Sequence, residues 1–370
     1  MLLNGANFPD GGYAIGDGYG EIAHWEPFQS AYLHWIADNY ESPWSDEAAQ
    51  HIAFLLGMAS HGMSDQLYDG MYLKRAAVYD EGAPGTPIGG DGSTDVSLAS
   101  KVGYPEFPDT WVPADVMAGL MLDAMGHKVD ADTISAGQGL LDFSLAYVAG
   151  ASEDPSLVLQ YAEAYPWASA HQTDETVPGS PVTTAPVVAA YWQFLWSRLH
   201  DEDHLNNPLL ARFPRVDSDR QVDETGIEAM VSFVVARGLH SDTVGTETIA
   251  IEDSNGHKQD LEVQLYYGHN SHVINLQPTD SWSKGLVHQV SVGPGLSTWD
   301  DEELGEFAFS FDAAGTTPQE TAGGCACGLN PMRPIVLAPW LLLLVIVCGQ
   351  PFTFKLPFRF GTMWQHRIRY

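Results

Sequence analysis

The spacing of apolar residues divides the chain into a helical first part and a strand-rich second part. Apolar positions recur at the three-to-four-residue period of a buried helix face in four segments, 27–40, 47–69, 113–126 and 183–204. Further along, short segments alternate apolar and polar residues, as strands with one buried face do: 246–253, 260–268, 272–278, 286–293 and 306–312. The pattern predicts an all-α domain followed by an all-β sandwich.

The C-terminal part follows neither period. Residues 334–354 are an uncharged run with WLLLLVIVC at its centre, long enough to cross a bilayer. The expected organisation is therefore a helical domain over 1–205, a sandwich over 213–314, a linker with a Cys-x-Cys motif over 315–333, a transmembrane segment over 334–354 and a basic tail over 355–370.

Charge narrows the choice of partners. The chain has 370 residues and a formal net charge of -32, and all of its acidic residues lie within 1–320. Such a surface repels nucleic acid, so nucleic acid is not a favoured partner. Cysteine is absent before Cys325, so any metal site in the body must use histidine and carboxylate.

One predicted helix carries polar residues on an otherwise apolar face. His61, Asp65 and Asp69 are spaced four residues apart, which stacks them on one side of the helix. Burying two unpaired carboxylates costs several kcal/mol, roughly, so a positive group or a proton is expected there. A buried Arg or Lys, a protonated carboxyl and a metal ion would each satisfy the requirement.

Two further residues extend the metal alternative. Asp10, in NFPDGGY, and His24, in EIAHWEPF, together with His61 and Asp65, make two imidazoles and two carboxylates, a typical ligand set for zinc. Three more carboxylates are candidates for a second site: Asp69, Asp91 and Asp95.

These segments, in the order GANFPDGGY, EIAHWEPF and GMASHGMSD, resemble the zinc-dependent phospholipase C family, and especially the catalytic domain of glycosylphosphatidylinositol-specific phospholipase D. The resemblance implies an all-α fold shared with S1-type nucleases, up to three zinc ions and hydrolysis of phosphoester bonds by a zinc-activated water. Carried over by position, it makes Asp10, His24, His61 and Asp65 ligands of one zinc, with Asp10 and Asp65 as the catalytic residues.

The chain departs from the family pattern in two ways. The family's first ligands would precede residue 1, so we expect the true start to lie upstream. The family holds its second zinc with histidines and a carboxylate, whereas here Asp69 occupies one histidine position and Asp91 and Asp95 come from a segment without histidine. A purely carboxylate site favours a harder ion such as Mg²⁺ or Ca²⁺, and a degraded second site is the alternative.

Weaker resemblances concern the second half. TETIAIEDSNG and KGLVHQVSVGPGL resemble bacterial Ig-like domains, and GGCACGLNPMRPIVLAPW resembles the MYXO-CTERM sorting tail. They imply an exported protein anchored at the cell surface through its C-terminal segment.

The resulting prediction is a zinc-dependent phospholipase C-like hydrolase whose substrate is a phospholipid or a related phosphoester. An S1-type nuclease and a catalytically inactive, surface-anchored binding or adhesion protein are the alternatives. The oligomeric state does not follow from the sequence.

Overall fold

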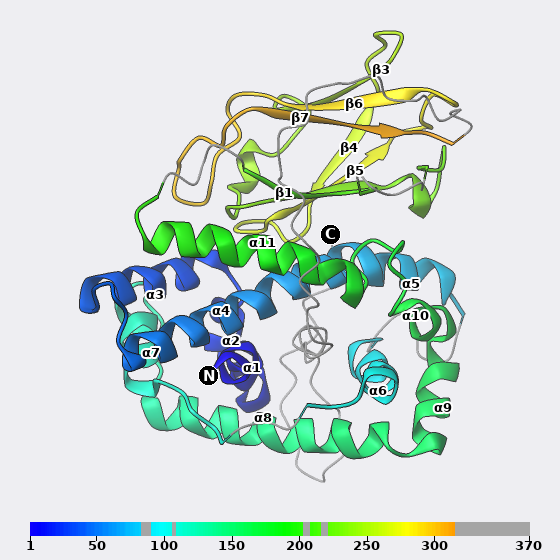
Figure 1. The fold of residues 1–370 in the computed structure, drawn as a ribbon. Helices are drawn as coiled ribbons and strands as arrows, with labels where there is room; N and C mark the ends of the chain where they lie inside the picture. The colour runs from blue at the N-terminus through cyan, green and yellow to red at the C-terminus, as the bar shows by residue number, and fades with distance from the viewer. Residues whose placement is uncertain (83–89, 106–108, 203–207, 216–220, 315–370) are drawn as a thin grey trace.

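The computed structural model describes residues 1–82, 90–105, 109–202, 208–215 and 221–314. Helices occupy the first part of this range, and two antiparallel sheets lie on one side of them (Figure 1). The α-helices are α1 (Leu2–Ile15), α2 (Tyr19–Ala23), α3 (Glu26–Asn39), α4 (Asp46–Leu67), α5 (Lys74–Tyr79), α6 (Gly90–Val102), α7 (Ala114–Asp123), α8 (Ala131–Ser152), α9 (Pro155–Ala164), α10 (Pro166–His171) and α11 (Pro181–Leu199).

Three shorter helical turns accompany them. A π-helical turn, η1 (Tyr68–Leu73), continues α4 directly into α5, and the 3-10 turns η2 (Ile227–Ala229) and η3 (Ser241–Thr243) belong to the strand-rich part. Single π-turns inside helices are frequent at functional sites. This one begins seven residues after His61.

The helix boundaries follow local signals. The Ser45 hydroxyl accepts the backbone N–H of Ala48 at 3.1 Å and caps α4. Gly16, with φ 73°, ends α1 in the left-handed conformation that glycine adopts at least cost. The helices predicted at 27–40, 47–69, 113–126 and 183–204 are confirmed as α3, α4, α7 and α11.

The strands form two sheets. One sheet has the order β1-β2-β5-β4 and the other β3-β6-β7, and every pairing is antiparallel. The strands are β1 (Leu209–Phe213), β2 (Val231–Val235), β3 (Ile249–Asp253), β4 (Leu261–Leu265), β5 (Val273–Pro278), β6 (Val287–Val292) and β7 (Phe307–Asp312). The five strands expected from alternation are confirmed as β3 to β7.

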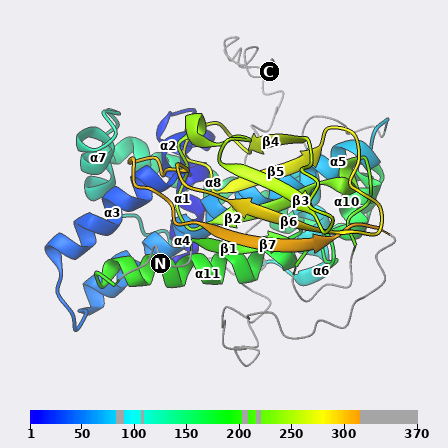
Figure 2. The same cartoon turned by 90° about the horizontal axis from the view of Figure 1, so that it is seen from above.

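The first sheet is covered on both faces. Along β2, Val231, Phe233 and Val235 point into the core between the two sheets, whereas Val234 and the preceding Met230 belong to the core of the helices. Figure 2 shows the strands lying across the helices in a view from the sheet side. Helices and sheets therefore share a core through β2.

The predicted fold class, an all-α domain followed by a sandwich and a transmembrane segment, is wrong. The described residues form a mixed structure of helices and two antiparallel sheets with a shared core. The cause is β2, which is buried on both faces, with Val231, Phe233 and Val235 toward the second sheet and Val234 toward the helices, so no exposed face marks it in the sequence.

The prediction of a membrane anchor is also corrected. A membrane span requires a helix that is both long and apolar, and no helix in the described ranges meets both conditions. The cell-surface anchoring that rested on this span is therefore not supported. The predicted linker, span and tail (315–333, 334–354 and 355–370) lie outside the described residues.

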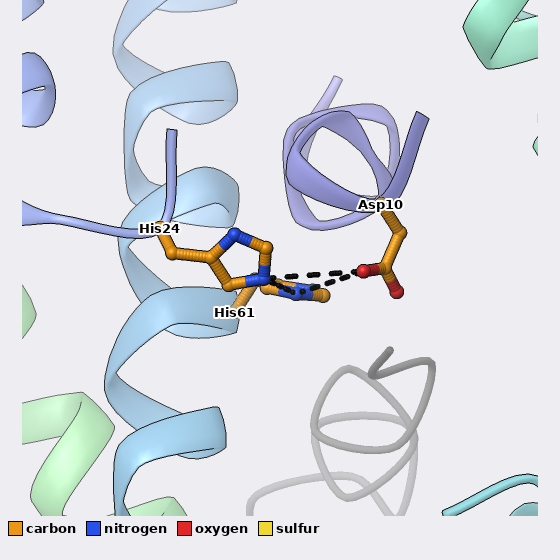
Figure 3. Close-up of side chains that lie close together, drawn as sticks. All are labelled: Asp10, His24 and His61. Atoms are coloured by element: carbon orange, nitrogen blue, oxygen red, sulfur yellow. Dashed lines mark hydrogen bonds and ion pairs between the residues drawn. The ribbon is translucent and has the colours of Figure 1, made fainter. Parts of the chain in front are cut away.

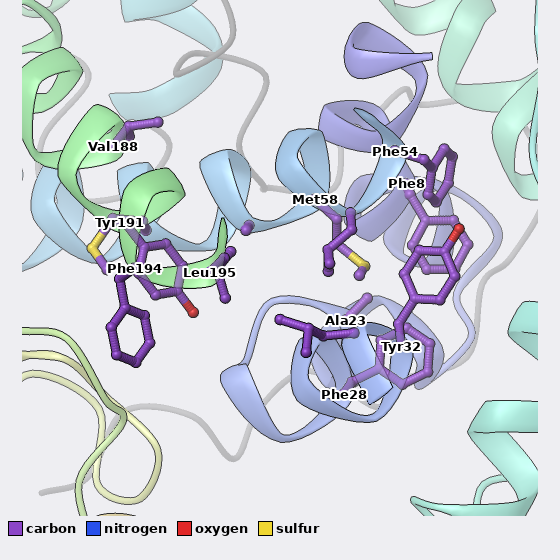
Figure 4. Close-up of a cluster of buried hydrophobic side chains, with 14 of the residues drawn as sticks. Phe8, Ala23, Phe28, Tyr32, Phe54, Met58, Val188, Tyr191, Phe194 and Leu195 are labelled. Carbon is purple, nitrogen blue, oxygen red and sulfur yellow. The ribbon is translucent and has the colours of Figure 1, made fainter. Parts of the chain in front are cut away.

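An aromatic cluster surrounds the N-terminal helix. Phe8 of α1 is fully buried, stacks on Tyr19 with ring centroids 5.3 Å apart and meets the edge of Phe54 at 5.5 Å (Figure 4). The ring centroid of Phe28, in α3, lies 6.3 Å from that of Phe8. This packing fixes α1, which carries Asp10, against α2, α3 and α4; His24 lies between α2 and α3, and His61 lies in α4.

Candidate metal centre

Three segments each bring one polar side chain to a buried point between them. Asp10 projects from α1, His24 follows directly after α2, and His61 lies in α4 (Figure 3). The exposed fraction is 4% for Asp10, 5% for His24 and 1% for His61. Among the described histidines, cysteines and acidic residues, these three form the group whose ligand atoms all lie within 4.8 Å of one another.

Glycines allow the three backbones to approach this closely. A Cβ on Gly57 of α4 would lie 2.0 Å from the carbonyl oxygen of Leu2 in α1. One on Gly62 would lie 2.1 Å from the carbonyl oxygen of His24. Any other residue would force the segments apart, so Gly57 and Gly62 set the spacing at the site.

The three ligand atoms face one another. The Nε2 atoms of His24 and His61 are 2.9 Å apart, and Asp10 Oδ1 lies 3.9 Å from the first and 3.6 Å from the second. The Nδ1 atom of His24 lies 2.6 Å from the carbonyl oxygen of Gly20 and must donate to it. The backbone of Ala6 hydrogen-bonds to the His61 ring, where Nδ1 is the nitrogen turned away from the cluster.

The protonation of the histidines follows from their surroundings. Burial lowers the pKa of His24, and burial together with the neighbouring His24 lowers the pKa of His61 well below its usual range. A neutral ring that donates from Nδ1 keeps a lone pair on Nε2, and it is Nε2 that each histidine brings close to Asp10 Oδ1. A cation between the three atoms would accept all of them as ligands.

The arrangement fits a metal ion. The point equidistant from the three atoms lies about 2.0 Å from each, and zinc binds nitrogen and carboxylate oxygen at about 2.0 to 2.2 Å. Donation of each Nδ1–H to a backbone carbonyl is the usual outer contact of a metal-bound histidine, because it orients the ring and raises its basicity. Asp10, His24 and His61 therefore suit a divalent ion that accepts nitrogen and oxygen ligands.

A second group of polar residues lines His24. The Tyr13 ring lies 5.1 Å from the His24 ring, and its hydroxyl donates to Glu21 at 2.6 Å. Trp25 Nε1 donates to the other oxygen of Glu21 at 3.0 Å. Burial and the Glu21 charge raise the pKa of Tyr13, so its hydroxyl stays protonated and the contact with Glu21 persists.

Two other predicted site residues lie near this centre. The charge of Asp65 acts on Tyr13 together with that of Asp10, so the half-buried Asp65 faces the same region. Burial and the charge of Asp10 raise the pKa of Asp95 well above its usual range, so the Asp95 carboxyl faces Asp10. Neither belongs to the group within 4.8 Å, and their assignment as ligands stays a prediction.

The remaining two predicted ligands are placed otherwise. Asp69 accepts a hydrogen bond from the Tyr266 hydroxyl at 2.8 Å, and burial raises the Asp69 pKa to about 6. Asp91 lies in α6, and its side chain is outside the described part of the chain. Their roles as ligands of a second ion also stay predictions.

Sequence patterns did not reveal several residues from the sheets that contact the neighbours of these ligands: Arg237, His272, Tyr266 and Tyr267. The signal that could have pointed to them is Glu26, an acidic residue in a segment that is otherwise typical of a buried helix. A fully buried carboxylate needs cationic partners, and the basic residues of this chain are few.

Comparisons with known proteins found partial similarity to phospholipases. The chain is 26% identical over 161 residues to the phosphatidylinositol-glycan-specific phospholipase D of Homo sapiens, and 29% identical over 117 residues to that of Bos taurus. The similar regions cover 39% and 30% of this chain, and 19% and 14% of those proteins. The Dictyostelium discoideum protein of the same name is 41% identical over 63 residues, 16% of this chain and 7% of that protein.

The similarity covers only part of this chain and a smaller part of each relative. The chain spans less than a fifth of the length of these curated relatives. No model of a protein family matches it. Among solved structures, the surface layer protein SbsC, domains 1–6, is 10% identical with a TM-score of 0.25, covering 78% of this chain and 40% of that one, too low a score to inform the fold.

Proposed function

We propose that this chain is a metal-dependent phosphodiester hydrolase that acts on phospholipids or related phosphoesters. The observation that carries the proposal is the convergence of two neutral, buried histidine nitrogens and one carboxylate oxygen on a single point. The partial similarity to phospholipases that cleave phosphodiesters supports the reaction class.

Asp10, His24 and His61 would hold the ion. Two imidazoles and one carboxylate suit zinc, which accepts nitrogen and oxygen and commonly keeps a position open for catalysis. Bound there, zinc would lower the pKa of a water molecule and polarise a phosphoryl oxygen.

The protein's own groups supply the rest. The carbonyl of Gly20 and the backbone of Ala6 keep the histidine protons on Nδ1, so both Nε2 atoms stay available at neutral pH. Asp10 and Asp65 are the carboxylates that would orient the attacking water and accept its proton. Burial and the charge of Asp10 raise the pKa of Asp95, so this carboxyl is more easily protonated than an exposed one.

The charge of the chain bears on the substrate. A net charge of -32 opposes the approach of a polyanion, whereas a phospholipid presents a single phosphodiester in a neutral or weakly charged head group. This favours a lipid or small phosphoester over single-stranded nucleic acid, the alternative of an S1-type nuclease.

The test is metal analysis of the purified full chain, with His61→Ala and Asp10→Asn as site variants. His257→Ala is the control, because the side chain of His257 is 74% exposed and contacts Asp253 instead. We expect close to one zinc per chain in the wild type and in His257→Ala, and none in the two site variants.

Hydrolysis assays then separate the reaction classes. Phosphatidylcholine vesicles, a small chromogenic phosphodiester and single-stranded DNA should each be offered to the zinc-loaded chain. Turnover of the first two and not of DNA is the expected result, and DNA cleavage alone would favour a nuclease. If the wild type binds no metal and hydrolyses none of them, the proposal is wrong and a non-catalytic binding protein becomes the better interpretation.

A further inference from the structure

The sheet that packs on the helices contacts them beside two of the three ligands. Glu26 lies two residues after His24, and its carboxylate is fully buried at this junction. Glu26 Oε1 accepts from Arg237 Nε at 2.5 Å and from Arg198 Nη1 at 3.0 Å, and Oε2 accepts from the backbone N–H of Gly238 at 2.5 Å. Arg237 and Gly238 follow β2, and Arg198 lies near the end of α11.

Arg237 is held from its other side as well. Its Nη1 donates to Glu302 at 2.6 Å, and its Nη2 donates to both oxygens of Asp300 at 2.7 Å. Arg237 is only 1% exposed, and these carboxylates surround its buried guanidinium. A buried charge network of this kind defines one geometry, because moving a single member leaves a charge unpaired in a medium of low polarity.

A second contact lies beside His61. Gln66 is five residues further along α4, and its Oε1 accepts from the Ser271 hydroxyl at 3.0 Å and from the backbone N–H of His272 at 2.8 Å. The Nε2 atom of His272 lies 4.0 Å from Glu26 Oε2. The segment that leads into β5 therefore contacts Gln66 in the helix of His61. His272 of the same segment also lies close to Glu26, which follows His24 by two residues.

A third contact covers the residue next to His24. Trp25 stacks on Tyr267 at 4.9 Å with the ring planes 15° apart. Tyr267 follows β4, in the connection to β5. The sheet thus contacts the neighbours of His24 at Trp25 and Glu26, and the helix of His61 at Gln66.

From this juxtaposition we infer that the β1-β2-β5-β4 sheet positions the metal ligands, with Glu26 and Arg237 as positioning residues for His24. The inference rests on the metal centre of the proposed function. The surrounding structure must hold the two Nε2 atoms 2.9 Å apart and both of them near Asp10 Oδ1. The five-residue α2 before His24 is too short to do this by itself.

The experiment measures zinc affinity in the full chain by competition with a chromogenic chelator, well below the unfolding temperature. Glu26→Gln keeps the shape of the side chain and removes its charge. The control is Glu228→Gln, because Glu228 also joins helices to the strand-rich part, through Arg75 at 3.2 Å and Tyr79 at 2.9 Å, both in α5. Both variants lose an ion pair between helices and strands, although the Glu228 side chain is 15% exposed and that of Glu26 is fully buried.

We expect Glu26→Gln to weaken zinc binding by about tenfold, the lower end of the effect of losing a direct partner of a metal ligand, because Glu26 lies two residues from His24 and acts on it through the backbone. Glu228→Gln should bind zinc like the wild type. The visible spectrum of bound Co²⁺ should also shift in Glu26→Gln and not in the control, because that spectrum reports ligand geometry and not stability. Wild-type affinity and an unchanged Co²⁺ spectrum in Glu26→Gln would overturn the inference.

Tyr267→Ala keeps the test decisive if Glu26→Gln does not fold. Tyr267 is 41% exposed, so its removal does not threaten the core, yet it takes away the stacking partner of Trp25. A measurable loss of zinc affinity in this variant supports the inference, and wild-type affinity overturns it. Absence of zinc from the wild type would instead refute the proposed function itself.

Discussion

Replacing Gly62 with alanine probes the contact that sets the spacing of the metal centre. The new Cβ would lie 2.1 Å from the carbonyl oxygen of His24 and 2.9 Å from Gln29 Nε2, whereas ordinary contacts begin at 3.4 Å. The carbonyl belongs to the backbone and accepts the Gln29 hydrogen bond at 3.0 Å, so it cannot rotate away without further loss. The α4 helix and the turn of His24 must therefore separate by about 1 Å.

The effect on stability and on metal binding follows from this displacement. Overpacking of a core contact costs about 1 to 3 kcal/mol, and replacing a helical glycine with alanine returns about 0.5 to 1 kcal/mol. The expected net loss in the free energy of unfolding is therefore about 0 to 2.5 kcal/mol. A separation of about 1 Å also moves the His24 and His61 nitrogens out of bonding range of a common ion, so zinc affinity should fall by at least about tenfold.

Gly139→Ala is the matched control. Gly139 lies in α8, and a Cβ there would meet nothing within 4 Å. This variant should gain up to about 1 kcal/mol and bind zinc like the wild type. Urea denaturation and chelator competition on both variants give the answer. Equal stability and equal zinc affinity in the two variants would refute the argument that Gly62 sets the spacing.

Three further predictions concern stability, each measured by denaturation of the zinc-free chain. Phe8→Ala empties the centre of the aromatic cluster and should cost about 3 to 5 kcal/mol, and a loss below 1 kcal/mol would mean that the cluster can collapse around the gap. Ser45→Ala removes the cap of α4 and should cost about 1 kcal/mol, whereas Ser45→Asp, which restores an acceptor, should not. Asp69 has its pKa raised to about 6 from an unfolded value near 3.8, so its contribution to stability is present below pH 4 and is lost as the pH rises through 6. The gain in stability of Asp69→Asn over the wild type should therefore grow by up to about 3 kcal/mol between pH 4 and pH 7, and a difference that does not vary with pH would contradict the burial of this carboxylate.

Part of the candidate centre could be predicted from residue types alone. Polar residues in an apolar helix require partners, and this requirement drew attention to His61, Asp65 and Asp69, whereas Asp10 and His24 were added by ligand type and by the family resemblance. Of the three helix residues, Asp69 is bound by a tyrosine from a sheet connection 197 residues away. A local sequence pattern predicts that a buried acid needs a partner, but it does not identify that partner.

The sequence by itself determined the positions of α3, α4, α7 and α11 and of five strands, because periodicity and capping act over a few residues, but it did not place α1 or the 22-residue α8. Only the tertiary structure decided that β2 packs on helices with one face and on the second sheet with the other, since an apolar strand such as Val231–Val235 has the same sequence whatever covers it. The tertiary structure also decided which polar residues meet. The distance between the two histidine nitrogens depends on close backbone contact at Gly57 and Gly62 and on packing between segments far apart in the chain.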